Sequence, residues 1–461
     1  AGARSESAHS RSVCSRARSR RASSRSSSGL QQEAARLRRL RAVQEAEHDA
    51  RHRALNVLEL RAHELREETL REAQLAALAA AASVLTADCA TVAFTTVYFA
   101  GGERLLLIQD LLKDENVEGV VIATAPHDHK EIAVAALKAG KHVYCEAPLG
   151  GTVEDARAIA KAAAANPKVN FQPGLQYRSE PQRQFMFPFM RAGAIGKAVH
   201  ARTQWHKKTS WRFVSPNAER EKLINWRLNP ELSPGLVGEI GMHQADIVNH
   251  FLKLQPVAVS GFGNTVQWRD GRKVPDTVNI VYEYANDFSL TQELTLANSF
   301  DGEYEVMHGT NSAVMLRGAQ AWMYKEADAP LIGWEVYARK MPHYGSPGVV
   351  LAAGATTLGK GGKKLYQEST FTQSPLFYSL EAFAYNSHQV KSAVEDFLNT
   401  FGEADAETLA DYLADQLGST NSLLPAADAT AGYQANVIAL KANEAVMTGK
   451  RVEIKPEDLT V

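Results

Sequence analysis

The segment around His243 gathers side chains suited to acid–base chemistry. Glu239 lies four residues before His243 and Asp246 three residues after it, in the run GEIGMHQAD. On a helix, residues three or four apart share one face, so both carboxylates could stand beside the imidazole. A neighbouring carboxylate raises the basicity of an imidazole and fixes its orientation, as a base that takes a hydroxyl proton requires. The alternative is a histidine that is simply packed in its helix.

A second group of polar side chains follows two apolar runs that we expect to be buried parallel strands. These runs are residues 117–124 and 143–145, and helical segments at 128–139 and 153–165 alternate with them. Such alternation predicts a parallel sheet with crossover helices, which binds ligands at the carboxyl ends of its strands. The residues expected at that edge are Thr124, Pro126, His129, Glu146 and Pro148.

We predict no metal site. His127, Asp128 and His129 carry the right atoms, but adjacent residues at a helix start seldom converge on one ion. Asp128 is better placed to cap the helix at its N-terminus.

Aromatic and planar polar side chains precede the His243 segment. Flat aromatic faces and planar hydrogen-bond donors suit a carbohydrate, although tryptophans at strand ends also serve in cores. The group comprises Trp205, His206, Trp211, Asn225, Trp226 and Arg227. Gln176, Tyr177 and Arg178, after a further strand candidate at 169–171, could contact a cofactor or a sugar.

The whole-chain composition excludes several classes of protein. The chain has 461 residues and a formal net charge of −1, which argues against a nucleic-acid partner. Three cysteines cannot build a disulfide framework. No run of 18 apolar residues exists, so we expect no membrane span.

The averages hide a division of the chain. Residues 1–112 contain 17 arginines and no lysine, and residues 1–28 hold 11 serines and 7 arginines. We expect residues 1–29 to be a disordered tail, because such a segment buries too little apolar surface to offset its ordering entropy. Residues 30–89, rich in Ala, Leu, Arg and Glu, predict a helical segment of doubtful origin.

From residue 91 onward the sequence resembles the Gfo/Idh/MocA family, which includes glucose-fructose oxidoreductase and inositol dehydrogenase. The run VEGVVIATAPHDHKEIAVAALKAGKHVYCEAPLG resembles the nucleotide-domain signature of that family. Further matches follow in the family's order: GLQYR at 174–178, AGAIGK at 192–197, GEIGMHQAD at 238–246, VPDTVNIVYEY at 274–284 and GTNSAVML at 309–316.

The resemblance implies an α/β fold in two parts. A partial Rossmann domain with a parallel sheet (90–174) is followed by an α+β domain (175–461) with a large, mostly antiparallel open sheet. Strand patterns at 198–207, 257–268, 277–285 and 288–296 agree with this independently, as does a helix at about 422–448.

The resemblance also implies a function: an NAD- or NADP-dependent oxidoreductase acting on a sugar or cyclitol. His243 would be the catalytic acid/base and Glu239 would orient it. The cofactor would contact Thr124, Pro126, His129, Glu146, Pro148 and Gln176; the substrate would contact Arg178, Trp226, Arg227 and Asp246. A homo-oligomer formed through the large sheet and a cytoplasmic location are further expectations, with a periplasmic location left open.

Three features depart from the family pattern. Glu239 stands where several of the family's dehydrogenases have the aspartate of Asp-x-x-x-His. No G-x-G-x-x-G loop is found, so either the first βαβ unit is lost or the sequence before about residue 90 is not in the native frame. The family's dehydrogenases carry E-K-P, whose lysine assists proton transfer, but this chain has Glu146-Ala147-Pro148.

These departures keep two other functions open. Some relatives are glycosidases that hold NAD tightly, use transient oxidation to drive elimination, and lack the lysine. A catalytically degenerate protein that binds a sugar or a nucleotide is the third possibility.

Overall fold

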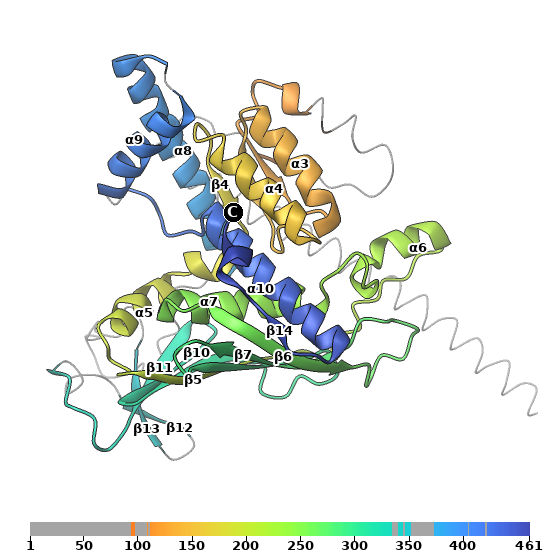
Figure 1. Ribbon diagram of the computed structural model, residues 1–461, viewed down its shortest axis with the longest axis vertical. Helices are drawn as coiled ribbons and strands as arrows, with labels where there is room; N and C mark the ends of the chain where they lie inside the picture. The colour runs from red at the N-terminus through yellow and green to blue at the C-terminus, as the bar shows by residue number, and fades with distance from the viewer. Residues whose placement is uncertain are drawn as a thin grey trace, which may run out of the picture. The chain divides into compact units, whose positions relative to one another are not determined.

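The computed structural model describes residues 94–96, 108, 111–333, 340–343, 346–351, 373–403, 405–419 and 422–461. Contacts between residues divide the chain into two units, 1–77 and 78–461, and all described residues belong to the second. Figure 1 draws these residues in colour. The tail expected at 1–29 and the helical segment expected at 30–89 lie outside the described residues.

The first part of the described chain is the expected parallel sheet. Its four strands are neighbours in chain order: β1 (Phe94–Thr96), β2 (Gly119–Ile122), β3 (His142–Cys145) and β4 (Phe171–Pro173). Every pairing is parallel. All side chains of β2 and β3 are buried, as their apolar composition predicts for strands covered on both faces.

The helices α3 (Pro126–Lys138) and α4 (Val153–Ala164) follow β2 and β3. The Thr152 hydroxyl caps α4 by accepting a hydrogen bond from the Asp155 amide at 3.1 Å, so this helix begins where the sequence predicted. The prediction that Asp128 caps the N-terminus of α3 is wrong. That helix begins at Pro126, whose missing N–H costs nothing in the first turn, and Asp128 lies inside it.

The second sheet has ten strands in the order β12-β13-β11-β10-β9-β5-β8-β7-β6-β14. It is antiparallel except where β5 pairs with β8, which confirms the mostly antiparallel expectation. The bounds are β5 (Ala198–His206), β6 (Pro256–Asn264), β7 (Thr277–Tyr284), β8 (Ser289–Thr295), β9 (Glu303–Gly309), β10 (Ser312–Arg317), β11 (Gln320–Lys325), β12 (Lys340–His343), β13 (Ser346–Val350) and β14 (Val452–Glu453).

Six further helices come before and between the strands of this sheet along the described chain. They are α5 (Pro181–Arg191), α6 (Ala218–Ile224), α7 (Met242–Leu252), α8 (Pro375–Phe401), α9 (Ala406–Ser419) and α10 (Ala429–Thr448). In Figure 1, α7 and α10 lie along one face of the sheet. Sequence analysis did not predict α8. This helix packs Leu380 and Phe383 against Val121 and Tyr144 of the parallel sheet.

Helix α10 joins the two sheets. It packs on β6 and, through Tyr433, Asn436 and Gly432, on the first part of the chain. Tyr433 Oη accepts a hydrogen bond from Arg157 at 2.6 Å, and Asn436 Oδ1 accepts one from the Gly150 amide at 3.1 Å. A Cβ at Gly432 would lie 2.7 Å from Pro173, so only glycine allows this close approach. The last part of the chain therefore fixes the ends of β3 and β4.

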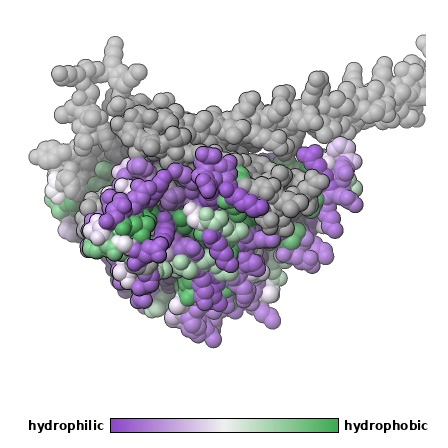
Figure 2. Space-filling view, turned by 90° about the horizontal axis from the view of Figure 1, so that it is seen from above, coloured by the Kyte–Doolittle hydropathy of each residue, from purple (hydrophilic) through white to green (hydrophobic). Residues whose placement is uncertain are grey.

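Figure 2 shows the described surface from above as mostly hydrophilic, with small apolar patches. Within the described ranges, no helix is both long and apolar enough to cross a membrane. The same residues contain no group of three His, Cys, Asp or Glu side chains that could hold a metal ion.

Candidate functional site

His243 lies in the first turn of α7, directly after a π-helical turn formed by Val237–Gly241. Single π-helical turns often mark functional sites. The Nδ1 atom of His243 is buried and has no hydrogen-bond partner among the residues described. Burial lowers the pKa of His243 to about 4, so the imidazole is neutral near pH 7 and can accept a proton.

The orienting contact expected between Glu239 and His243 is not made. Glu239 accepts hydrogen bonds from Arg227 Nε at 3.1 Å and from the Ser233 hydroxyl at 3.5 Å. The π-helical turn explains the difference, because it changes the angular spacing that puts residues four apart on one face of an α-helix. The carboxylate that acts on His243 is Asp246, whose charge raises the imidazole pKa against the larger effect of burial.

Asp246 is held by Arg178 in a bidentate ion pair. The Nε–Oδ2 distance is 2.8 Å and the Nη2–Oδ1 distance is 2.7 Å. Arg178 belongs to the 3-10 helix Gln176–Ser179 that follows β4, so the pair ties the parallel sheet to α7. The structure thus brings together two residues that the sequence predicted separately.

Tyr177 supports His243 from the side. The two rings meet edge to face, with centroids 5.9 Å apart. The Arg183 guanidinium lies 4.0 Å from the centroid of the Tyr177 ring and is itself buried between Glu180 and Glu305, with which it forms ion pairs. Sequence analysis missed Arg183 and Glu305; the available signal was a charged residue inside the apolar helix PQRQFMFPFMR.

His129 connects the ends of β2 and β3. Its Nδ1 lies 3.0 Å from the carbonyl oxygen of Pro148, and its Nε2 lies 3.0 Å from that of Thr124. Burial lowers the pKa of His129, and a neutral ring can donate to only one of these carbonyls. Both ring nitrogens face the protein backbone, so His129 positions the two turns. Pro126 is buried beneath them.

Glu146 ends its strand with its carboxyl group against β4. A Cβ added at Gly174 would lie 2.6 Å from Glu146 Oε2 and 2.9 Å from Glu146 Cα, so the close approach of the two backbones requires glycine at 174. Burial raises the pKa of Glu146 to about 7, and the charge of Arg227 opposes that rise. Arg227 therefore acts on two buried carboxyl groups, Glu146 and Glu239.

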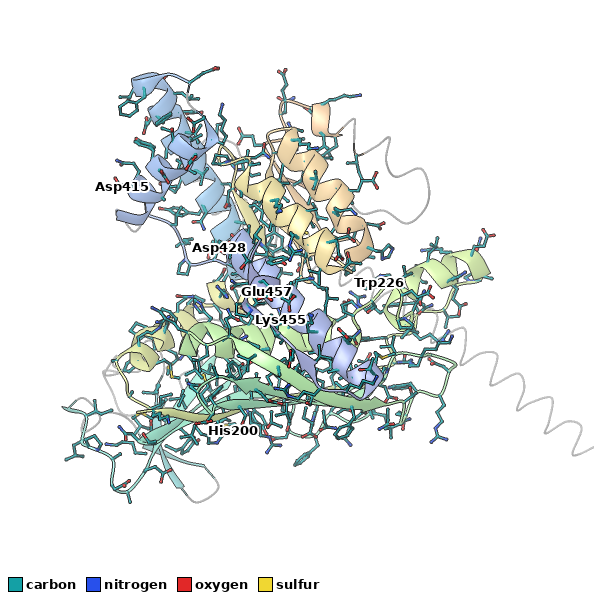
Figure 3. All side chains as sticks on the ribbon, viewed as in Figure 1. His200, Trp226, Asp415, Asp428, Lys455 and Glu457 are labelled. Atoms are coloured by element: carbon teal, nitrogen blue, oxygen red, sulfur yellow. The ribbon has the colours of Figure 1, made fainter. Side chains whose placement is uncertain are left out.

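The Trp226 ring contacts both Arg227 and His127 of α3. The Arg227 guanidinium lies 4.4 Å from the centroid of the Trp226 ring, and the His127 ring meets that of Trp226 edge to face at 6.4 Å. Figure 3 labels Trp226 next to the segment that carries α6. Trp226 therefore lies next to His127 in the first turn of α3, and the charge of Arg227 acts on Glu146 after β3.

Ala147 is partly buried at the turn after β3. It packs against a cluster made of Leu175, Met242 and four alanines: Ala427, Ala431, Ala435 and Ala439. Met242 is the residue before His243, so the turn at Ala147 and the start of α7 are neighbours. Gln176 begins the 3-10 helix beside them.

Two family models match this chain. Residues 45–174 match the model described as "Oxidoreductase family, NAD-binding Rossmann fold", and residues 188–314 match the GFO/IDH/MocA C-terminal domain. The first match begins inside the segment 30–89 that the sequence patterns set apart as helical.

Curated proteins match over part of their length. The chain is 32% identical over 163 residues to 1,5-anhydro-D-fructose reductase of Ensifer adhaerens, covering 34% of this chain and 46% of that protein. It is 25% identical over 224 residues to 2,7-anhydro-N-acetylneuraminate hydratase of Escherichia coli, covering 45% and 53%. The chain thus spans about half the length of these relatives.

A solved structure has the same fold. The inositol dehydrogenase homolog of Azotobacter vinelandii, complexed with NAD+, superposes with a TM-score of 0.54 at 16% identity, covering 76% of this chain and 81% of the other.

Proposed function

We propose that this chain, which belongs to the Gfo/Idh/MocA oxidoreductase family, oxidises or reduces a sugar or cyclitol with a nicotinamide cofactor and uses His243 as acid/base. The observation that carries the proposal is the buried Nδ1 of His243, which has no hydrogen-bond partner among the described residues and lies near the Arg178–Asp246 pair. The relatives that act on anhydro sugars support a carbohydrate substrate.

The residues at the strand ends fit a nicotinamide cofactor. Thr124 Oγ1, like His243 Nδ1, is buried without a hydrogen-bond partner in the described part of the chain, and such groups usually have one. Thr124, Glu146 and Pro148 would hold the cofactor at this edge, with Gln176 beside them. When bound, the cofactor supplies hydride transfer.

The protein's own contribution is proton transfer and positioning. Neutral His243 accepts the proton of the substrate hydroxyl as that carbon is oxidised, and returns it in reduction. The Asp246 carboxylate stabilises the imidazolium that forms, and Arg178 keeps Asp246 in place. Trp226 offers a flat face to a sugar ring, and Arg227 beside it offers hydrogen-bond donors.

Replacing the proposed base tests the proposal. Purified protein is mixed with NAD+ or NADP+ and a panel of sugars and cyclitols, and absorbance of the reduced cofactor is followed. We expect His243→Ala to lower kcat by about 10²–10⁴-fold, the usual contribution of a positioned acid/base. NADH affinity, measured by fluorescence, should stay within about twofold, since the variant leaves the strand ends intact.

His200→Ala is the matched control, because His200 lies on β5 in the large sheet (Figure 3), where its side chain hydrogen-bonds Ser289 and stacks on His308. Turnover that survives in His243→Ala as well as in the control would overturn the assignment of the base.

A second candidate function is glycoside cleavage by transient oxidation and elimination. Ala147 favours it, because it removes the lysine of the dehydrogenases, and so does the similarity to a hydratase of an anhydro sugar. Aryl glycosides incubated without added NAD+ separate the two functions. Release of the aglycone supports cleavage, whereas net NADH production from free sugars without cleavage supports the dehydrogenase.

A binding protein without turnover is the third candidate, and NADH binding with no reaction in either assay supports it.

A homo-oligomer through the large sheet stays a prediction, supported by exposed Val281 and Phe262 on neighbouring strands.

A further inference from the structure

A pocket lies beside α7, and both members of the Arg178–Asp246 pair line it. Its volume is about 370 Å³. Helix α7 contributes one wall and the first turns of α10 the other, with Arg191 at the end of α5. His243 does not line it. The polar lining residues are Arg178, Arg191, Asp246, Asn249, His250, Lys253, Gln255, Asp428, Thr430 and Gln434.

The charges in this pocket leave a positive excess. Arg178, Arg191 and Lys253 face two carboxylates, Asp246 and Asp428. Arg178 already neutralises Asp246 through both of its oxygens. Asp428 accepts a hydrogen bond from the Ala431 amide at 2.7 Å and so is engaged as the cap of α10.

The two remaining cations, Arg191 and Lys253, have no carboxylate partner in the described part of the chain. The Arg191 guanidinium packs over the Phe187 ring, 4.5 Å from its centroid, and forms no ion pair there. Lys253 ends α7 with a positive φ of 53° and also forms none. Burial, followed by the charge of Arg178, lowers the pKa of His250 to about 4, so His250 adds no charge near pH 7.

Neutral polar groups complete the pocket. Gln255 Nε2 donates to Gln434 Oε1 at 3.1 Å, which presents two amides side by side, and the Thr430 hydroxyl stands next to them at the start of α10. Amides and hydroxyls are the groups that bind sugar hydroxyls. In Figure 3, Asp428 marks the end of α10 at which these groups gather.

We propose that this pocket binds the anionic group, a carboxylate or a phosphate, of a small acidic sugar derivative. Arg191 and Lys253 hold the anion, and the amides and Thr430 bind the hydroxyls. The volume fits one such molecule, because ligand pockets start at about 300 Å³.

Calorimetry with defined sugars tests this site. D-glucose 6-phosphate and D-gluconate carry the two anionic groups, and D-glucose carries neither. We expect at least one of the acidic sugars to bind and glucose to bind at least about tenfold more weakly, as loss of one charged hydrogen bond predicts. The acidic sugar that binds identifies the anionic group.

The variants are chosen to spare the fold. Arg191→Gln and Lys253→Asn remove the two unpaired charges, and asparagine tolerates the positive φ of residue 253. We expect each to weaken binding of the acidic sugar about tenfold. Lys138→Gln, in the last turn of α3, is the matched control and should bind as the wild type does.

Equal affinity of the wild type and both variants, or glucose binding as tightly as the acidic sugars, would overturn the proposal. The same titrations in His243→Ala keep it separate from the proposed function. The acidic sugar should bind that variant unchanged, whether or not the wild type shows turnover.

Discussion

Arg178 and Asp246 meet in a bidentate ion pair that lines the pocket beside α7 and whose carboxylate acts on His243. His243 lies three residues before Asp246 on α7, and the same pocket holds Arg191 and Lys253. The side chains of Arg178 and Asp246 are 16% and 5% exposed. Because the pair ties the end of β4 to α7, it fixes the position of the proposed base relative to the strand ends.

Removing one member of this pair should be costly. Asp246→Asn leaves a buried guanidinium without its carboxylate, and we expect a loss of about 3 kcal/mol of unfolding free energy in urea denaturation. Replacing both residues, as Arg178→Met with Asp246→Leu, should restore most of that stability but not turnover. Lys130→Met, at an exposed ion pair, is the control and should leave the urea midpoint nearly unchanged. A double variant as unstable as Asp246→Asn contradicts this account.

Gly174→Ala should disturb the Glu146 turn. The added Cβ would lie 2.6 Å from Glu146 Oε2 and 2.9 Å from its Cα, so the end of β3 must move. We expect about 1–3 kcal/mol of destabilisation and weaker NADH binding by fluorescence titration. Gly151→Ala is the matched control, since its Cβ would meet no atom within 4 Å. Similar behaviour of the two variants would show that the close approach at Gly174 is unimportant.

Ala147→Lys restores the E-K-P sequence but should not restore a lysine mechanism. The side chain would enter the cluster of Leu175, Met242 and the alanines of α10, and overpacking of this kind costs about 1–3 kcal/mol. We expect a lower Tm and no gain in turnover. Ala165→Lys, at the exposed C-cap of α4, controls for the added charge. Faster sugar oxidation at unchanged Tm would instead show that the site accommodates the lysine.

His142 should make stability pH-dependent. Its Nδ1 accepts a hydrogen bond from the Asn170 amide at 2.8 Å, and burial lowers its pKa from 6.5 to about 4. A depressed histidine pKa favours folding above pH 6.5 and loses that contribution as the pH falls towards 4, because the unfolded chain takes up the proton first.

The comparison of wild type with His142→Gln isolates this effect, since glutamine accepts the same hydrogen bond without titrating. We expect the stability advantage of the wild type to shrink by about 2 kcal/mol between pH 7 and pH 5 in urea denaturation. His243 and His250 titrate in both proteins and cancel. An advantage that is constant with pH would refute the assigned pKa.

The regular elements could largely be predicted because their signals are local. Buried runs such as Gly119–Ile122 give β2, and the Thr152 hydroxyl gives the start of α4. Gly449, with a φ of 66°, ends α10 at the predicted place. Each of these features depends on a few neighbouring residues, so a single sequence is enough to predict it.

The arrangement of the site could be predicted only in part. The sequence placed His243, Glu239 and Asp246 in one segment. The α-helical spacing paired His243 with Glu239, but no local sequence pattern predicts the π-helical turn at Val237–Gly241, which changes that spacing. Arg183 and Glu305 lie 122 residues apart, so their contact below Tyr177 has no local pattern.

The sequence by itself determined the two sheets, the strand-end edge with Thr124 and Glu146, and the residues that could do chemistry. Only the tertiary structure decided which of them meet: Arg178 with Asp246, Arg227 with Glu239, and Ala147 with α10. The physical reason is that strands and caps form from neighbours along the chain, whereas ion pairs and close packing depend on how distant elements approach each other.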